Sequence, residues 1–68
     1  MRVDVQELRA RMVYHKHFQK DVANAIGVSR QSFIRKLQTG YFTISEIHKM
    51  MDFIPLTREE ACKIFFAN

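Results

Sequence analysis

The sequence has 68 residues, 47% of them hydrophobic, and a formal net charge of +4 at pH 7. This length fits a single domain, and the hydrophobic content is enough for a real core, so we expect an ordered chain. The lone cysteine, Cys62, excludes an internal disulfide. No apolar run approaches the roughly 20 residues of a membrane span and no signal-peptide pattern opens the chain, so we expect a soluble, cytoplasmic protein without membrane contact.

Apolar residues recur mostly at every third or fourth position, and only two glycines and one proline interrupt them. This spacing predicts an all-α domain. Residues 1–40 contain eight Lys or Arg against three acids, a balance of +5, whereas residues 41–68 contain three against four, a balance of −1. Such a concentrated positive field favours phosphate binding. A solvated basic surface is the alternative, and charge alone does not decide between them.

The first predicted helix covers residues 4–14. Asp4 and Glu7 have the spacing of a capping box, with an acid at the N-cap and another three residues later. The expected inward stripe, at i, i+3 and i+7, consists of Val5, Leu8 and Met12.

The connection over residues 15–18, HKHF, holds two histidines but predicts no metal site. Zinc usually takes four Cys, His or carboxylate ligands, and neither a CxxC nor an HxxxH spacing is present. Phe18 stands where a serine or threonine would cap the next helix. We expect its ring to be buried against the first helix.

Two short helices, over residues 19–26 and 29–38, are predicted around Gly27. The chain needs a residue there that adopts the left-handed conformation without a Cβ clash. Ser29 can cap the second helix by accepting a hydrogen bond from a free backbone N–H. The expected inward residues of the two helices are Val22, Ala23, Ile26, Phe33 and Leu37.

The other faces of the second of these helices carry polar and basic side chains. They include Arg30, Gln31 and Arg35, together with Ile34. A helix that turns arginine, glutamine and serine outward suits a DNA major groove. An ordinary helical hairpin with a glycine turn is the alternative.

The fourth predicted helix covers residues 43–54 and follows Gly40, which ends the third. Thr43 and Glu46 form a T-x-x-E capping box. Pro55 stops the helix, because the residue before proline is pushed out of the helical region. The expected buried face consists of Ile44, Ile47, Met51 and Ile54.

A fifth helix is predicted over residues 57–66, with Thr57 and Glu60 as a further capping box. Its expected inward residues are Ala61, Ile64 and Phe65. Two interpretations of the remaining surface stay open. Either Cys62, Phe65 and Phe66 contact a second copy or another partner, or both phenylalanines close the core.

Residues 19–37 resemble the helix-turn-helix of the Cro and repressor class of bacterial and phage transcription regulators. The matching residues are Gln19, Ala23, Gly27, Val28, Phe33 and Leu37. Ala23 is the most informative match, because two helices that cross near a right angle need a small side chain where they touch. The closing segment, LTREEACKIFFAN, is similar to that of small Cro-like regulators of phages that infect Gram-positive hosts. The resemblance covers most of residues 5–67.

The resemblance implies a compact five-helix repressor-like domain in a bacterial host cell, which occupies a double-stranded DNA operator. Base contacts are implied for Arg30, Gln31, Ser32, Ile34 and Arg35. Phosphate contacts are implied for Gln19, Lys20, Ser29, Lys36, Thr39 and Tyr41. For Tyr41, packing at a helix junction is an equal alternative, and the stretch from Gly27 to Gly40 is one residue longer than is usual in the family. A homodimer through the C-terminal helix would suit a palindromic operator.

An antirepressor-type module that binds another phage regulator is the alternative function. Ile34 and the C-terminal helix would then form the contact surface. The basic face favours DNA, because a pure protein binder has little use for Arg30, Arg35 and Lys36 together. We expect no enzyme activity, cofactor or metal, because the sequence has no nucleophile–base spacing, phosphate loop or ligand cluster.

Overall fold

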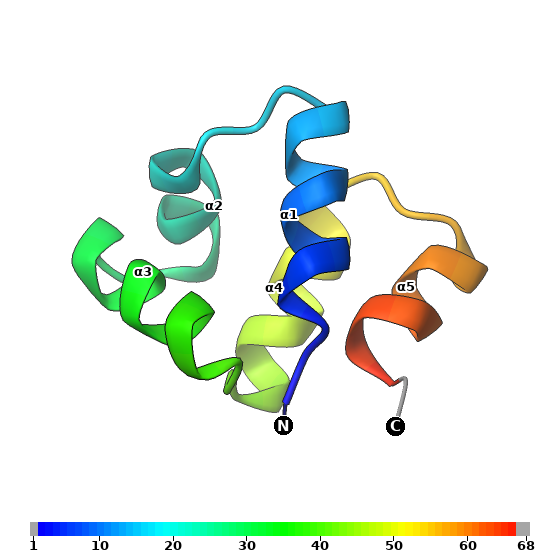
Figure 1. Cartoon of the computed structure of the whole chain (residues 1–68). Helices are drawn as coiled ribbons and strands as arrows, with labels where there is room; N and C mark the ends of the chain where they lie inside the picture. The colour runs from blue at the N-terminus through cyan, green and yellow to red at the C-terminus, as the bar shows by residue number, and fades with distance from the viewer. Residues whose placement is uncertain (1, 67–68) are drawn as a thin grey trace.

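A computed structural model describes residues 2–66 of the chain and shows an all-α domain (Figure 1). Its five helices are α1 (Val5–Tyr14), α2 (Gln19–Ile26), α3 (Arg30–Thr39), α4 (Ile44–Phe53) and α5 (Arg58–Phe65). Over these residues the only strand-like pairing is an isolated antiparallel bridge between Arg2 and Tyr41. The predicted fold class is confirmed, and each helix lies within about one residue of its predicted bounds.

The helices surround one core. In Figure 1, α2 and α3 form one side of the molecule, α1 and α4 cross its middle, and α5 forms the other side. Helix α2 packs against both α3 and α4, while α1 packs against α5. The core consists of Val3, Leu8, Met12, Val22, Ala23, Ile26, Phe33, Leu37, Phe42, Ile47, Met50, Ile54, Ala61, Ile64 and Phe65. None of the described helices is long and apolar enough to cross a membrane.

Local capping chemistry explains where α4 and α5 begin. The Thr43 hydroxyl accepts the N–H of Glu46 at 3.1 Å, and the Glu46 carboxylate accepts the N–H of Thr43 at 2.9 Å. Thr57 and Glu60 exchange the same two bonds at 3.1 and 3.0 Å. Both predicted capping boxes are confirmed. In α1 only one of the two bonds forms: the Asp4 carboxylate accepts the N–H of Glu7 at 3.2 Å.

The prediction that Phe18 is buried is wrong, because 68% of this residue is exposed. The connection turns at Lys16, which has a φ of +60°. His17 then places its ring 4.6 Å from that of Phe53, at the end of α4. The histidine therefore takes the packing position, and the next side chain is turned outward. Helix α2 lacks a side-chain N-cap, and Asp21 instead accepts the Phe18 N–H at 3.3 Å.

The predicted buried face of α4 is partly wrong. Ile47 and Ile54 are buried, but Met50 occupies the place expected for Met51, and Ile44 is 52% exposed. Successive helical residues are rotated by about 100°, so Ile44 lies roughly 90° from the centre of the stripe formed by the buried residues. Met51 is partly buried at the edge of the core.

The two phenylalanines at the end of α5 have different environments. Phe65 is 1% exposed and belongs to the core, as its predicted inward position requires. It therefore cannot form part of a contact surface with Cys62 and Phe66, and that prediction is wrong for Phe65. Phe66 is 49% exposed and Cys62 is exposed. Neither of the two sequence interpretations holds for both rings.

Replacement of Ala23 by leucine should destabilise the fold. Ala23 is 1% exposed in the helix that packs against both α3 and α4. Additional methyl groups there should lower the free energy of unfolding by about 1–3 kcal/mol, as measured by urea denaturation. Ala10→Leu makes the same change at an exposed helical position, where we expect an effect within about 0.5 kcal/mol. Equal losses in the two variants would contradict tight packing around Ala23.

Candidate nucleic-acid interface

The turn between α2 and α3 has the geometry that the sequence predicts. Gly27 adopts the left-handed conformation with a φ of +82°. The N–H of Val28 donates to the carbonyl of Ala23 at 3.0 Å. A Cβ at Gly27 would meet no atom within 4 Å, so the backbone conformation alone favours glycine there. Ser29 caps α3 by accepting the Ser32 N–H at 3.1 Å.

Helix α3 has one buried face and one exposed polar face. Phe33 is fully buried and Leu37 is 3% exposed, which fixes the rotation of the helix on the core. The opposite face carries Arg30, Gln31 and Arg35, all exposed. Within residues 2–66, these three side chains have no ion pair or hydrogen bond to another residue. Their donors are therefore free to bind a ligand.

Two of the predicted base contacts lie nearer to the core. Ser32 and Ile34 are half-buried. The sequence places Ile34 with the outward polar residues, and it lies at the boundary between the polar face and the core. Its methyl groups are only partly available to a ligand.

Lys36 is held within the protein. Its Nζ lies 3.2 Å from Oε2 of Glu46, and the two side chains are 25% and 13% exposed. Burial by itself raises the pKa of Glu46, but the N–H of Thr43 and the Lys36 ammonium outweigh this effect, so the pKa lies below 4.5. The pair joins the end of α3 to the start of α4. Lys36 thus positions α3, and its charge is already matched.

Thr39 and Tyr41 lie at the exit of α3. The Thr39 hydroxyl donates to the Lys36 carbonyl at 3.3 Å and accepts the Tyr41 N–H at 3.3 Å. It is therefore occupied by local backbone groups. Tyr41 is 57% exposed, so its ring is not a packed junction residue. The guanidinium carbon of Arg2 lies 5.8 Å from the centre of this ring.

A surface hollow of about 540 Å³ lies where α2 and α3 begin. Its lining residues are Phe18, Gln19, Lys20 and Arg30. Gln19 and Lys20, which are predicted to contact phosphates, thus lie beside Arg30, which is predicted to contact a base. Free backbone N–H groups and the positive dipole ends of helices favour anions at such places.

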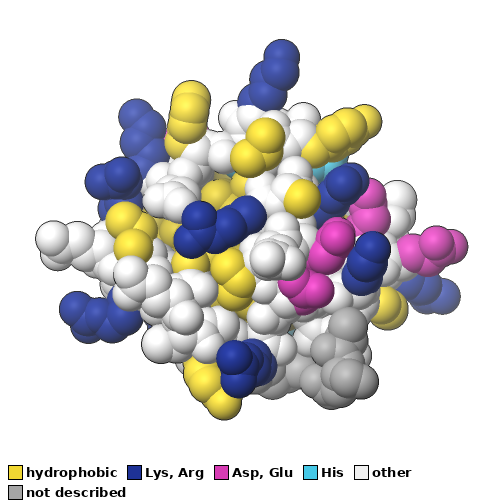
Figure 2. All heavy atoms as spheres, viewed as in Figure 1, with side chains coloured by type: hydrophobic (Ala, Val, Ile, Leu, Met, Phe, Trp, Pro, Cys, Tyr) yellow, Lys and Arg dark blue, Asp and Glu magenta, His cyan; other side chains and the backbone are white. Residues whose placement is uncertain are grey.

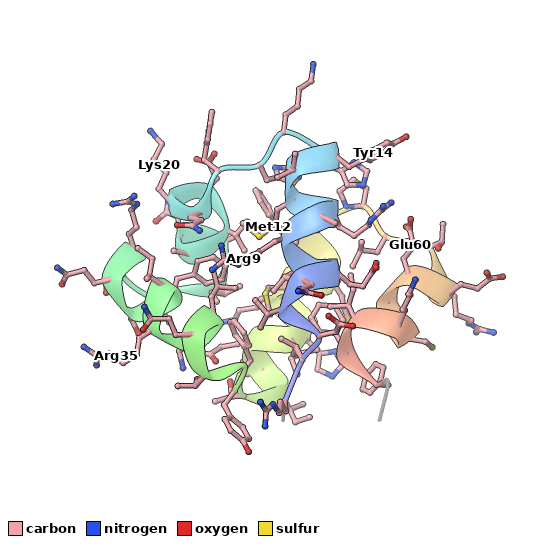
Figure 3. All side chains as sticks on the ribbon, viewed as in Figure 1. Arg9, Met12, Tyr14, Lys20, Arg35 and Glu60 are labelled. Carbon is pink, nitrogen blue, oxygen red and sulfur yellow. The ribbon has the colours of Figure 1, made fainter. Side chains whose placement is uncertain are left out.

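Charge is distributed unevenly between the two sides of the molecule. Figure 3 places Lys20 and Arg35 on the side of α2 and α3, and Glu60 on the opposite side, near α5. On the face seen in Figure 2, Lys and Arg side chains are spread over the first of these sides, while the visible acidic side chains lie on the other, among further basic ones. Two basic residues on that second side are matched by acids. Arg11 lies 2.8 Å from Glu60, and Lys63 lies 3.5 Å from Glu7.

Two residues beside this candidate interface were not predicted from the sequence. Phe18 borders the hollow at the start of α2, and its signal was an aromatic residue at an N-cap position. Arg2 lies beside the exit of α3 through its bridge to Tyr41, and no local pattern indicates that contact. Among residues 2–66, no group of three His, Cys, Asp or Glu could hold a metal ion.

Comparisons with protein-family models, characterised proteins and solved structures found no match to this chain.

Acidification should weaken the fold partly through Glu46. Its pKa is lowered in the folded protein, so its contribution is full above about pH 4.5 and is lost as the pH falls through the folded value. The free energy of unfolding, measured by urea denaturation between about pH 6 and pH 3, should therefore decrease less for Glu46→Gln than for the unmodified protein. Glu59→Gln, at an exposed position, should keep the original slope. Identical pH profiles for all three proteins would contradict this role.

Proposed function

We propose that this protein is a sequence-specific DNA-binding transcription regulator, a Cro-like repressor of phage or prophage type that occupies an operator. One observation carries the proposal. Helix α3 is anchored by Phe33 and Leu37 and exposes Arg30, Gln31 and Arg35 without partners inside the described chain. A helix of this kind, on the more positive side of a small domain, fits a major groove.

The exposed residues of α3 match base edges chemically. An arginine can donate two hydrogen bonds to O6 and N7 of guanine, and a glutamine can pair with N6 and N7 of adenine. These roles fall to Arg30, Arg35 and Gln31. Ser32 and Ile34 are half-buried, so less of each side chain is available to contact a base.

Phosphate groups on one side of the groove would bind at the start of α2. Lys20 is exposed there, and Gln19 shares the same hollow with Arg30. Ser29 offers its hydroxyl at the start of α3. Such contacts fix the register of the protein on the duplex and carry little sequence information. A homodimer on a palindromic operator would use the exposed Cys62 and Phe66 of α5.

A protein-interaction module is the second candidate, favoured by exposed apolar residues. Val13, Tyr14 and Phe18 are 75%, 69% and 68% exposed and lie around the connection between α1 and α2. An antirepressor that binds another regulator could use such a surface. It would need neither Arg30 nor Arg35.

Selection from a randomised duplex library separates the two functions. The protein is incubated with the library at near-physiological salt, and the retained duplexes are sequenced. An inverted repeat with half-sites about one helical turn apart would support a dimeric regulator, and a single half-site would support a monomer. Salt-sensitive binding without enrichment would contradict the operator proposal and favour the protein-interaction module.

Arg35→Ala should reduce discrimination between the selected site and random DNA. Loss of a bidentate base contact costs about 1–3 kcal/mol on the correct site and little elsewhere. Lys20→Ala is the comparison, because loss of a phosphate contact should weaken both duplexes alike and reduce the salt slope by about 0.9. Dissociation constants from fluorescence anisotropy test both variants. Equal losses on the two duplexes for Arg35→Ala would remove this residue from the base contacts.

A further inference from the structure

The N-terminal segment is fixed against the exit of α3. Arg2 forms an antiparallel bridge with Tyr41, and the N–H of Val3 donates to the carbonyl of Gly40 at 2.7 Å. In Figure 1 the described residues before α1 lie beside the connection between α3 and α4. The backbone of Arg2 therefore has a defined place next to the helix that carries the polar face.

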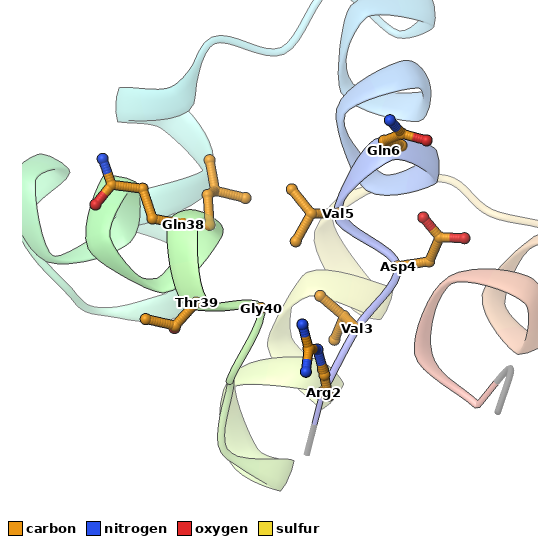
Figure 4. A pocket seen from close by; sticks show the side chains of 9 residues that line it. Arg2, Val3, Asp4, Val5, Gln6, Gln38, Thr39 and Gly40 are labelled. Atoms are coloured by element: carbon orange, nitrogen blue, oxygen red, sulfur yellow. The ribbon is translucent and has the colours of Figure 1, made fainter.

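The side chain of Arg2 is also held. Its guanidinium carbon lies 5.8 Å from the centre of the Tyr41 ring, within the range of a cation–π interaction. A Cβ at Gly40 would lie 3.4 Å from Cγ of Arg2, an ordinary van der Waals distance, so the arginine stem passes directly beside this residue. Figure 4 shows this stem beside Gly40, at the rim of a hollow of about 300 Å³ between the N-terminal segment and the last turn of α3.

The guanidinium of Arg2 remains free to bind an anion. The residue is exposed, and no carboxylate of residues 2–66 forms an ion pair with it. The nearest acid in sequence, Asp4, accepts the N–H of Glu7 at the start of α1. A guanidinium that rests on an aromatic face keeps its planar fork of donors, which fits phosphate oxygens, and loses little conformational freedom on binding.

We propose that Arg2 binds a DNA phosphate beside the groove that α3 occupies, and that Tyr41 is a positioning residue that holds the guanidinium. This inference rests on the proposed function. Lys20 lies at the start of α2 and Arg2 lies beyond the end of α3, so the two cations flank the exposed face of α3. Phosphates border a major groove on both sides. The full charge of Arg2 outweighs the roughly half negative charge of the α3 C-terminal dipole.

The salt dependence of DNA binding tests Arg2 directly. Arg2→Gln removes the charge and keeps a polar stem, while Arg58→Gln makes the same change at an exposed position on α5. For Arg2→Gln, the slope of log K against log salt should fall by about 0.9, and the affinity at 0.1 M salt should fall about eightfold on selected and random duplexes alike. Arg2→Lys should restore the slope. Arg58→Gln should resemble the unmodified protein.

Two substitutions of Tyr41 test its positioning role. Tyr41→Leu removes the ring and keeps every charge, so it should weaken binding in the presence of Arg2 and have no further effect in the Arg2→Gln background. Tyr41→Phe keeps the ring and should bind normally. A loss in Tyr41→Phe as large as in Tyr41→Leu would instead assign a phosphate contact to the hydroxyl and overturn the positioning role.

The outcomes separate this inference from the proposed function. Sequence-selective binding by the unmodified protein, with equal slopes for Arg2→Gln and Arg58→Gln, would overturn the Arg2 site alone. Absence of DNA binding by the unmodified protein would overturn both. Circular dichroism melting curves identify any variant that fails to fold. If Arg2→Gln fails, Arg2→Lys decides the result. An unchanged salt slope in Arg2→Lys supports a phosphate contact, and a reduced slope contradicts a charge contact at this position.

Discussion

The orientation of α3 depends on the burial of one aromatic ring. Phe33 is fully buried, and its ring centre lies 6.0 Å from that of Phe42, which follows the exit of α3. Leu37, which is 3% exposed, is the other buried side chain of this helix. These two side chains set the rotation of α3 about its axis, and the ion pair between Lys36 and Glu46 holds its last turn. The free arginines and glutamine on the opposite face keep their direction only while this ring remains packed.

The basic residues fall into two groups, those in ion pairs and those without them. Lys36 and Arg11 are paired with carboxylates of other helices, Lys36 with one on the next helix and Arg11 with one 49 residues away. Arg30 and Arg35 have no such partner within residues 2–66. The net charge therefore overstates the number of cationic side chains that an anionic partner could bind. The paired cations hold helices together, and the unpaired ones remain accessible.

Local chemistry could be predicted from the sequence, and long-range placement could not. The helix starts at Thr43 and Thr57 follow from capping bonds over three residues, and the turn at Gly27 follows from its backbone alone. The errors concern side chains whose environment is set by other helices. Phe18 is exposed because His17 occupies the position against α4, and Ile44 is exposed because it lies roughly 90° from the centre of the buried stripe of its helix.

The candidate site shows the same division. The polar face of α3 could be predicted because it is the complement of an i, i+4 apolar pair on the same helix. The pairing of Lys36 with Glu46 could not, because it spans the break between two helices. Arg2 was missed for the same reason, since its partners follow α3 in the chain.

The N-terminal segment connects two parts of the fold. Consecutive backbone donors tie it to two separate parts of the fold, because the N–H of Val3 donates to Gly40 and the N–H of Asp4 donates to Ile64, each at 2.7 Å. The exit of α3 and the last turn of α5 are thus joined through two adjacent peptide groups. The position of Arg2 beside α3 is consequently fixed from both sides of the molecule.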